Sequence, residues 1–211
     1  MSFMKPQIVD FEDVVDDMQE DGSLPEGEMH AGGYAWRLSA PGYLDCTEWA
    51  YAASVSSAII DCIERYDGEL DTEDLYVLGS WLSGFEEFLE GYLYGLAFTA
   101  TDSDGKSLYK NPGGDIRDVV DTDKFLKMFS EEDQARILID CVSFVALAGD
   151  RISDAFGDAG SDFHLTRNRH GAGFQDGDWV HEEGLVALSR TFGECCVYEA
   201  ETEPHSLFLG Q

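Results

Sequence analysis

The sequence predicts an α+β protein, with a helical body followed by a small C-terminal mixed α/β unit that holds a short antiparallel sheet. Apolar residues recur at helical spacing over much of residues 44–156, and short β-like runs replace this pattern within residues 162–211. With 211 residues, 44% of them hydrophobic, the chain is long and apolar enough to bury a sizeable core. We therefore expect one α+β domain over residues 34–211, preceded by a separate segment, residues 1–33.

The segment 1–33 is predicted to be an acidic arm. It carries nine Asp or Glu residues and one Lys, and it contains turn signals at Asp21-Gly22 and Gly32-Gly33. We expect a mobile arm with one short helix, and ordered structure from residue 34 onward.

Two helices are predicted at the start of the body. Residues 44–66 have apolar positions at helical spacing and a natural stop at Gly68, and a second helix is expected over residues 71–96. Glycines inside the second helix would either allow close helix contacts or break it near Gly91. These glycines are Gly79, Gly84, Gly91 and Gly95.

A loop over residues 102–121 is expected to lead into a third helix, residues 130–156, where Ser130 and Asp133 approximate a capping box. Beyond it the sequence predicts short strands and one more helix. The strands are expected at residues 163–166, 173–174, 195–198 and 206–209, and the helix at 180–192.

The segment 162–179 is the candidate site because it concentrates Arg and His in an acidic chain. Alternation in a strand would place Asp162, His164 and Thr166 on one side, followed by a hairpin turn that includes Asn168. One interpretation is structural: Asp162 and Asp176 would pair with Arg167, while Thr166 and Asn168 would bind turn amides.

The alternative is a small enzyme or ligand-binding module centred on this segment. Asp162 and His170 are the catalytic candidates, with His170 as acid or base, while Thr166, Arg167 and Asn168 would bind a ligand through an anion clamp. The structural interpretation is favoured, because the sequence has no HExxH, GxSxG or phosphate-loop motif. No cofactor is expected. No metal site is expected either, since the D-x-D segments lack the remaining ligands of a calcium-binding loop.

The sequence AGSDFHLTRNRHGAGFQDGDW resembles the signature AGHDFWLTRNGHGAGFWD of a family of uncharacterised proteins found mainly in bacteriophages and other mobile elements. The resemblance extends over roughly the C-terminal two-thirds of the chain, and the signature is specific for the family rather than for an activity. The matching polar residues are Asp162, Thr166, Arg167, Asn168, His170 and Asp176. The departures are Ser161, His164, Arg169 and Gln175, where the signature has His, Trp, Gly and Trp.

Net charge is the strongest indication of a partner. Forty-three acidic residues against thirteen Lys and Arg give a formal charge of -30, and residues 66–105 contain ten acids and no Lys or Arg. Such a surface repels nucleic acids and anionic membranes and attracts basic protein surfaces. The residues expected to bind a partner are Asp10, Asp13, Asp16, Asp17, Asp67, Glu69, Asp71, Glu73, Asp74, Glu86, Glu87 and Glu90.

These observations predict a phage-type acidic accessory protein that inhibits a basic nucleic-acid-binding host protein by imitating nucleic acid. The resemblance implies a restriction, CRISPR or nuclease target, and an enzymatic role is less favoured. Adaptation to high salt is a further explanation of the acidity. The start of the chain lacks signal-peptide features, and no apolar run reaches the roughly 20 residues of a membrane span. We therefore expect the host cytoplasm as the location.

Overall fold

The computed structural model describes residues 4–24, 32–40, 46–66, 68–102, 104–109, 114–199 and 206–210. It confirms the α+β class. The chain divides into two compact units, an N-terminal unit, Met1–Leu82, and a C-terminal unit, Ser83–Gln211. The expected boundary at residue 33 therefore does not coincide with the boundary between the units.

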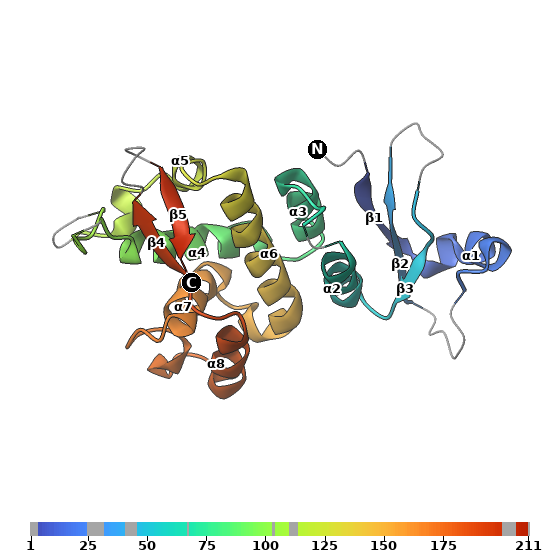
Figure 1. Cartoon of the computed structure of the whole chain (residues 1–211). Helices are drawn as coiled ribbons and strands as arrows, with labels where there is room; N and C mark the ends of the chain where they lie inside the picture. The colour runs from blue at the N-terminus through green and yellow to red at the C-terminus, as the bar shows by residue number, and fades with distance from the viewer. Residues whose placement is uncertain are drawn as a thin grey trace. The chain divides into compact units, whose positions relative to one another are not determined.

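A three-stranded antiparallel sheet organises the N-terminal unit (Figure 1). It consists of β1 (Lys5–Asp10), β2 (Tyr34–Ser39) and β3 (Ala50–Ala52), in that order. The expectation of a mobile arm is therefore wrong for the described residues of β1. This strand pairs with β2 over its full length, and its Ile8 is buried opposite Trp36.

Both faces of this sheet are covered (Figure 1). The short helices η1 (Phe11–Asp13) and α1 (Val15–Asp21) follow β1, and their apolar residues join a buried cluster with residues from and beside the sheet. This cluster contains Phe11, Val14, Met18, Ala35 and Trp49. On the other side, α2 (Val55–Arg65) and α3 (Thr72–Gly79) pack against β1 and β2.

Two predicted helices have different bounds in the structure. The helix expected over 44–66 begins at Val55, because Ser54 and Ser57 form a capping box and the residues before them include β3. The helix expected over 71–96 is two helices, α3 and α4 (Phe85–Thr99). The break is at Gly84, which has a left-handed φ of 70°, and Gly91 lies inside α4.

The C-terminal unit is built from helices α4 to α8 and a two-stranded antiparallel sheet. The remaining helices are α5 (Thr122–Leu126), α6 (Glu131–Ala148), α7 (Phe156–Arg167) and α8 (Glu182–Thr191), with η2 (Ile116–Asp118), η3 (Gly149–Ile152) and η4 (Phe174–Asp176) as short 3-10 turns. The strands β4 (Cys196–Glu199) and β5 (Leu207–Gly210) confirm the predicted C-terminal pair. Ser130 caps α6 as expected, but α6 ends at Ala148 rather than at residue 156.

The strand predicted at residues 163–166 is wrong, because these residues belong to α7. Residues 173–174 likewise form no strand, since Phe174 begins η4. The buried positions of α7 recur at helical spacing and pack on α4, and Phe163 stacks on Phe144 of α6 with ring centroids 4.1 Å apart. Across the described ranges, none of the helices has the length and apolar character that crossing a membrane requires.

Candidate functional site

The candidate segment is positioned by an unusually close packing of α7 on α4. A methyl group at Gly160 would overlap the carbonyl oxygen of Phe88, and one at Gly91 would overlap the carbonyl oxygen of Gly157. The hydroxyl of Ser161 donates a hydrogen bond to the carbonyl oxygen of Gly91 at 2.8 Å. Gly91 therefore serves close helix contact, whereas Gly84 marks the break, so both roles that the sequence allowed occur.

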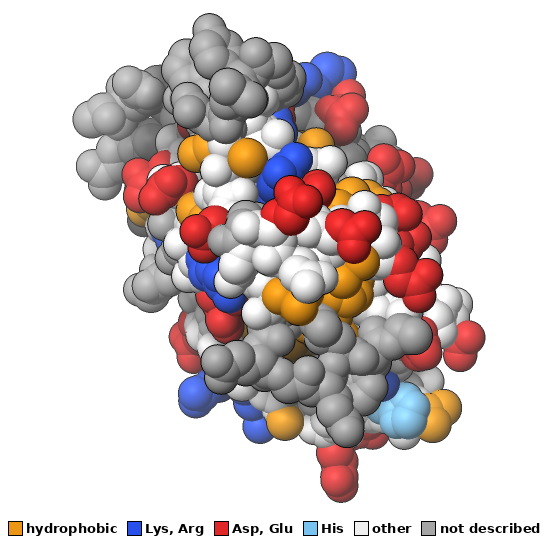
Figure 2. Space-filling model, turned by 90° about the vertical axis from the view of Figure 1, so that its right-hand side faces the viewer, with side chains coloured by type: hydrophobic (Ala, Val, Ile, Leu, Met, Phe, Trp, Pro, Cys, Tyr) orange, Lys and Arg blue, Asp and Glu red, His pale blue; other side chains and the backbone are white. Residues whose placement is uncertain are grey.

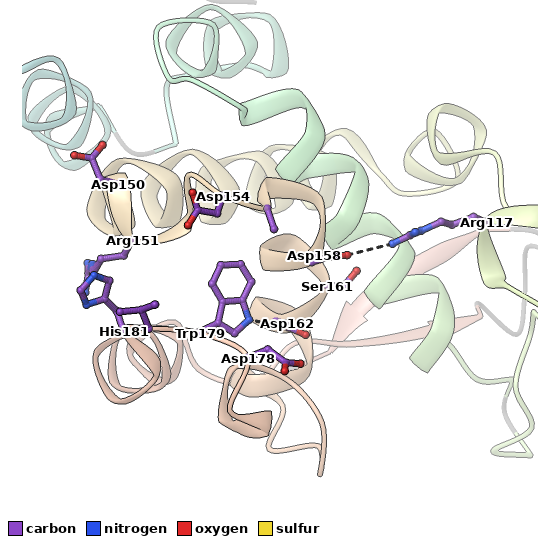
Figure 3. A pocket seen from close by; sticks show the side chains of 12 residues that line it. Arg117, Asp150, Arg151, Asp154, Asp158, Ser161, Asp162, Asp178, Trp179 and His181 are labelled. Carbon is purple, nitrogen blue, oxygen red and sulfur yellow. Dashed lines mark hydrogen bonds and ion pairs between the residues drawn. The ribbon is translucent and has the colours of Figure 1, made fainter.

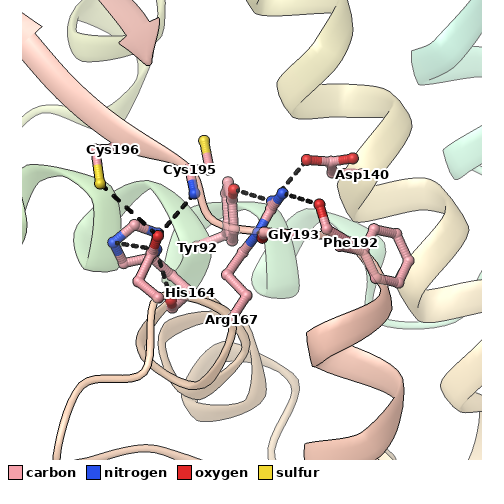
Figure 4. Close-up of polar contacts among 9 residues, drawn as sticks. Tyr92, Asp140, His164, Arg167, Phe192, Gly193, Cys195 and Cys196 are labelled. Atoms are coloured by element: carbon pink, nitrogen blue, oxygen red, sulfur yellow. Dashed lines mark hydrogen bonds and ion pairs between the residues drawn. The ribbon is translucent and has the colours of Figure 1, made fainter. Parts of the chain in front are cut away.

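Arg167, at the end of α7, is a buried structural cation (Figure 4). Its Nη1 donates to Asp140 Oδ2 at 2.6 Å and to the Tyr92 hydroxyl at 2.8 Å. Its Nε and Nη2 donate to the carbonyl oxygens of Gly193 at 2.7 Å and Phe192 at 2.8 Å. Burial alone would lower the pKa of Arg167. The interactions with Tyr92 and Asp140 outweigh this effect and raise the pKa, so Arg167 stays protonated.

These contacts correct two expectations for Arg167. Its ion-pair partner is the half-buried Asp140 of α6, and neither Asp162 nor Asp176 forms an ion pair with it in the structure. With three of its nitrogens already donating to protein groups, Arg167 is not available as a clamp for an anionic ligand.

Asn168 joins α7 to the C-terminal sheet. Its Oδ1 accepts a hydrogen bond from the backbone N–H of Cys195 at 2.7 Å, and its Nδ2 donates to the carbonyl oxygen of His164 at 2.9 Å. Thr166 accepts a bond from the backbone N–H of Phe174 at 2.9 Å, as expected for a residue that binds a turn amide. Both side chains are therefore engaged in holding the fold, which leaves them little capacity to bind a ligand.

His164 is a neutral core residue. Its Nε2 lies 2.7 Å from the Thr99 hydroxyl, which itself donates to carbonyl oxygens of α4, and its Nδ1 lies 3.2 Å from Asn168 Nδ2. This pattern fits a proton on Nε2 and an acceptor at Nδ1. Burial, reinforced by the nearby charges of Arg167 and His170, lowers the pKa of His164 to about 3.

The two catalytic candidates do not converge. Asp162 lines a hollow beside α7, whereas His170 is exposed and lines a different hollow together with Arg169 and Arg190. An acid–base pair made of Asp162 and His170 is therefore not assembled in this structure.

The hollow that contains Asp162 has a volume of about 580 Å³ and an acidic wall (Figure 3). Its acidic residues are Asp150, Asp154, Asp158, Asp162 and Asp178. Burial, together with neighbouring aspartates, raises the pKa of Asp162, although its Oδ2 accepts a hydrogen bond from Trp179 Nε1 at 2.7 Å. Arg117 partly neutralises the wall through a contact of 3.6 Å with Asp158.

The acidic wall was not predicted as a site. The sequence signal was an acid at every fourth position in Asp150, Asp154, Asp158 and Asp162. This spacing places Asp158 and Asp162 on one side of α7, while Asp150 lies in η3 and Asp154 precedes α7. A neighbouring hollow of about 350 Å³ shares Asp158 and Arg117 with this one and adds predicted partner-binding residues of α4. These are Glu87 and Glu90.

The other residues predicted to bind a partner have mixed surroundings. Exposed ones include Asp10, Asp13, Asp16 and Asp17 around α1, together with Glu69, Glu86, Glu87 and Glu90. Figure 2 shows acidic side chains spread over one face of the molecule.

Near α3 one lysine offsets part of the acidic charge. Lys5 lies within ion-pair distance of Asp71, Glu73 and Asp74, at 3.4, 3.2 and 3.1 Å. Asp74 is buried, and together with Asp71 it caps α3. We therefore remove Asp74 from the predicted partner surface, and Asp67 lies outside the described residues.

Within the described ranges, no three His, Cys, Asp or Glu side chains are grouped as a metal site would require. Comparisons with protein-family models, with curated proteins and with solved structures find no match to this chain. The resemblance to the phage family therefore stays a prediction from its motif.

Proposed function

We propose that this protein binds a basic surface of a nucleic-acid-binding host protein and occupies the place of nucleic acid phosphates. The observation that carries the proposal is a set of exposed carboxylates around η1 and α1 that form no ion pair with any described residue. Within the part of the chain that the structure describes, none of the ion pairs involves Asp10, Asp13, Asp16 or Asp17.

The spacing of these acids supports mimicry. Met18 of α1 belongs to the buried cluster of the N-terminal unit, and Val15 packs against this cluster. Asp16, Asp17 and Glu20 are exposed. Side chains three or four positions apart on a helix lie about 5–6 Å from each other. Duplex DNA carries one charge per about 1.7 Å of its axis, so such a row reproduces part of the field that basic clefts recognise.

The unpaired negative charge around α1 also supports a binding function, because it destabilises the free protein. Neighbouring carboxylates on a short helix repel one another and weaken it. The sequence between residues 6 and 36 contains no Lys or Arg that would relieve this repulsion. A basic partner would relieve it on binding, and electrostatic attraction would also accelerate the encounter.

The phage-like motif adds a biological context to the proposal. A phage-encoded acidic protein would act in the host cytoplasm against an enzyme of host defence, such as a restriction, CRISPR or nuclease component. The absence of a membrane-spanning helix among the described residues is compatible with this location.

The test is affinity capture from host lysate with the tagged full-length protein, at salt concentrations from about 0.05 M to about 0.5 M. We expect a DNA- or RNA-processing protein that is released as salt rises and is displaced by duplex DNA. Neutralising the acids around α1 should weaken capture at low salt about tenfold or more. The variant combines Asp13→Asn, Asp16→Asn, Asp17→Asn and Glu20→Gln.

The matched control removes the same number of charges from exposed acids of the C-terminal unit and should bind like the wild type. It combines Asp118→Asn, Glu132→Gln, Asp176→Asn and Glu183→Gln. Equal capture by the wild type and by the α1 variant at every salt concentration would overturn the proposed role of this surface.

A further inference from the structure

The hollow lined by His170 differs in charge from the rest of this acidic molecule. It has a volume of about 520 Å³, and no carboxylate is among its lining residues. These residues are Thr166, Arg169, His170, Gly171, Gln175 and Arg190. In a chain with 43 acidic and 13 basic residues, two arginines and a histidine therefore share one hollow without an acid in its wall.

The backbone of Arg169 is held in a conformation that favours glycine. Among the described residues, Arg169 is the one non-glycine with a positive φ, 57°. A side chain in this left-handed region is strained, and Gly would adopt the same conformation without that strain. The chain keeps an arginine at this position despite the strain, which indicates that the side chain has a use at the hollow.

Hydrogen bonds on both sides hold the turn that carries Arg169 and His170. The backbone N–H of His170 donates to the carbonyl oxygen of Leu165 at 3.0 Å, and Gln175 Nε2 donates to the carbonyl oxygens of His170 at 2.8 Å and Ala172 at 2.6 Å. A braced turn reduces the ordering cost that ligand binding would otherwise carry. The donors of the hollow are thus held in place before a ligand arrives.

The donor side chains are also largely unoccupied. Arg169 Nε lies 3.4 Å from Glu194 Oε1, and the two terminal nitrogens of Arg169 have no partner among the described residues. In the described ranges, no ion pair involves His170 or Arg190, and both are exposed. Two guanidinium groups and one imidazole therefore offer N–H donors to the same open space.

We infer that this hollow binds the phosphate group of a small phosphorylated molecule. Three donor side chains suit the three terminal oxygens of a phosphate monoester better than the two oxygens of a carboxylate. The volume lies within the range of small-molecule sites. A nucleic acid strand is disfavoured electrostatically, because the remaining acidic surface repels a polyanion. A single phosphate group interacts mainly with the local charges within a Debye length of about 8 Å.

The inference is independent of the acidic surface around α1, and its test uses the full-length protein. Inorganic phosphate, phenyl phosphate and acetate are titrated separately while the ¹H–¹⁵N NMR signals of the arginine side chains and of the turn are followed. We expect saturable shifts with both phosphates, confined to the hollow, and an affinity for acetate about tenfold weaker or less.

Two variants make the test decisive. Arg169→Gly should weaken phosphate binding about tenfold or more, while its thermal unfolding midpoint stays equal to that of the wild type or rises, because the backbone strain is removed. Arg190→Gln should weaken binding similarly. The matched control Arg117→Gln removes an exposed arginine from the acidic hollow and should leave phosphate affinity unchanged.

Three results would overturn the inference: no saturable phosphate binding by the wild type, unchanged affinity in both Arg169→Gly and Arg190→Gln, or equal affinities for acetate and phosphate. Tighter binding of a single-stranded oligonucleotide than of phenyl phosphate would instead identify a nucleic-acid site and reject the small-molecule assignment.

Discussion

Arg167 is expected to be the most sensitive single residue of the C-terminal unit. Replacing it with Met would leave the Asp140 carboxylate without its partner and would remove the donors to Phe192 and Gly193. Breaking a buried ion pair from one side costs about 3–5 kcal/mol, and the partial exposure of Asp140 places the expectation at about 3 kcal/mol. Urea unfolding monitored by circular dichroism measures this loss.

The control for this prediction is Arg190→Met. Arg190 is exposed on α8 and takes part in none of the ion pairs of the described residues, so its replacement should change the free energy of unfolding by no more than about 0.5 kcal/mol. Similar losses for the two variants would contradict a structural role for Arg167.

His164 should make the stability of the protein depend on pH. Its pKa is about 3 when folded, against 6.5 ordinarily, so below pH 6.5 the unfolded chain gains a proton that the folded chain does not bind. The stability that this neutral histidine contributes is fully present above pH 6.5, and it falls by about 1.4 kcal/mol per pH unit as the pH decreases toward 3.

The measurement compares the wild type with His164→Gln, whose amide can still donate to Thr99. Between about pH 7 and about pH 5, above the usual range of carboxyl groups, the wild type should lose about 2 kcal/mol more than the variant. His181→Gln, at an exposed position, should behave like the wild type. Parallel pH profiles for the wild type and His164→Gln would show that His164 is not the group responsible.

At the residue scale, the motif indicates the role of Thr166, which binds a turn amide, but not the partners of Arg167 and Asn168. Thr166, Arg167 and Asn168 are all engaged, as their concentration in one segment suggested. The partners of Arg167 and Asn168, however, are distant in sequence: Tyr92 lies 75 positions from Arg167, and Cys195 lies 27 positions from Asn168. Local spacing cannot reveal such partners, so the sequence alone could not distinguish a clamp for a ligand from an internal brace.

At the scale of elements, the contact between α4 and α7 gives a prediction in which two physical effects have opposite signs. Helix propensity alone would make Gly160→Ala stabilising by about 1 kcal/mol. The added methyl group, however, would overlap the Phe88 carbonyl oxygen and force the helices apart. We expect the packing effect to dominate and the variant to lose about 2 kcal/mol of stability.

Gly184→Ala is the matched control, because Gly184 lies in α8 and an added Cβ would meet just the flexible end of Arg151, at 3.3 Å. Chemical denaturation of both variants should show opposite signs relative to the wild type. A stabilised Gly160→Ala would show that the two helices do not pack as closely as the structure indicates.

The same contact explains which elements the sequence could predict. The sequence predicts the helices α6 and α8 and the strands β4 and β5 because their own residue patterns specify them, and Ser130 also caps α6. The helix α7 was misread as a strand because four residues, 163–166, fit a period of 2 as well as a helical period. The neighbour that decides between these periods is α4, which packs against α7.

Hydrophobic periodicity also does not predict the break before α4 or the start of α2 at Val55. Apolar spacing continues across Gly84, so periodicity does not distinguish it from the other glycines of this stretch, while the backbone turns at that glycine with a φ of 70°. Trp49 and Ala52 fitted a helical face but are buried in the sheet region of the N-terminal unit. The break before α4 and the start of α2 both depend on tertiary packing, which cannot be inferred from either segment alone.

For the whole molecule, the acidic residues form more than one group. Exposed acids lie around α1 in the N-terminal unit, and a second group lines the hollows beside α4 and α7 in the C-terminal unit. The motif segment supplies an internal brace and a hollow without acids. The same segment also contributes Asp162 and Asp178 to the acidic hollow, so the motif and the acidic surface overlap there.

The response to salt separates mimicry from adaptation to high salt. With a formal charge of -30, self-repulsion destabilises the folded chain, and added salt screens it. If the acids serve a basic partner, the protein should be folded at about 0.1 M KCl, and its thermal midpoint should rise gradually up to about 0.5 M as the repulsion is screened. Circular dichroism melts at increasing KCl measure this.

Adaptation to high salt leads to a different curve, with cooperative folding lost below about 1 M salt. That result would remove the main argument for a basic partner, because the exposed acids around α1 would then be explained by hydration alone. Repeating the melts with the α1 variant sharpens the comparison. If the acids serve a basic partner, the variant should be more stable than the wild type at low salt, because repulsion between the carboxylates around α1 destabilises the free protein. This difference in stability should vanish as salt screens the repulsion.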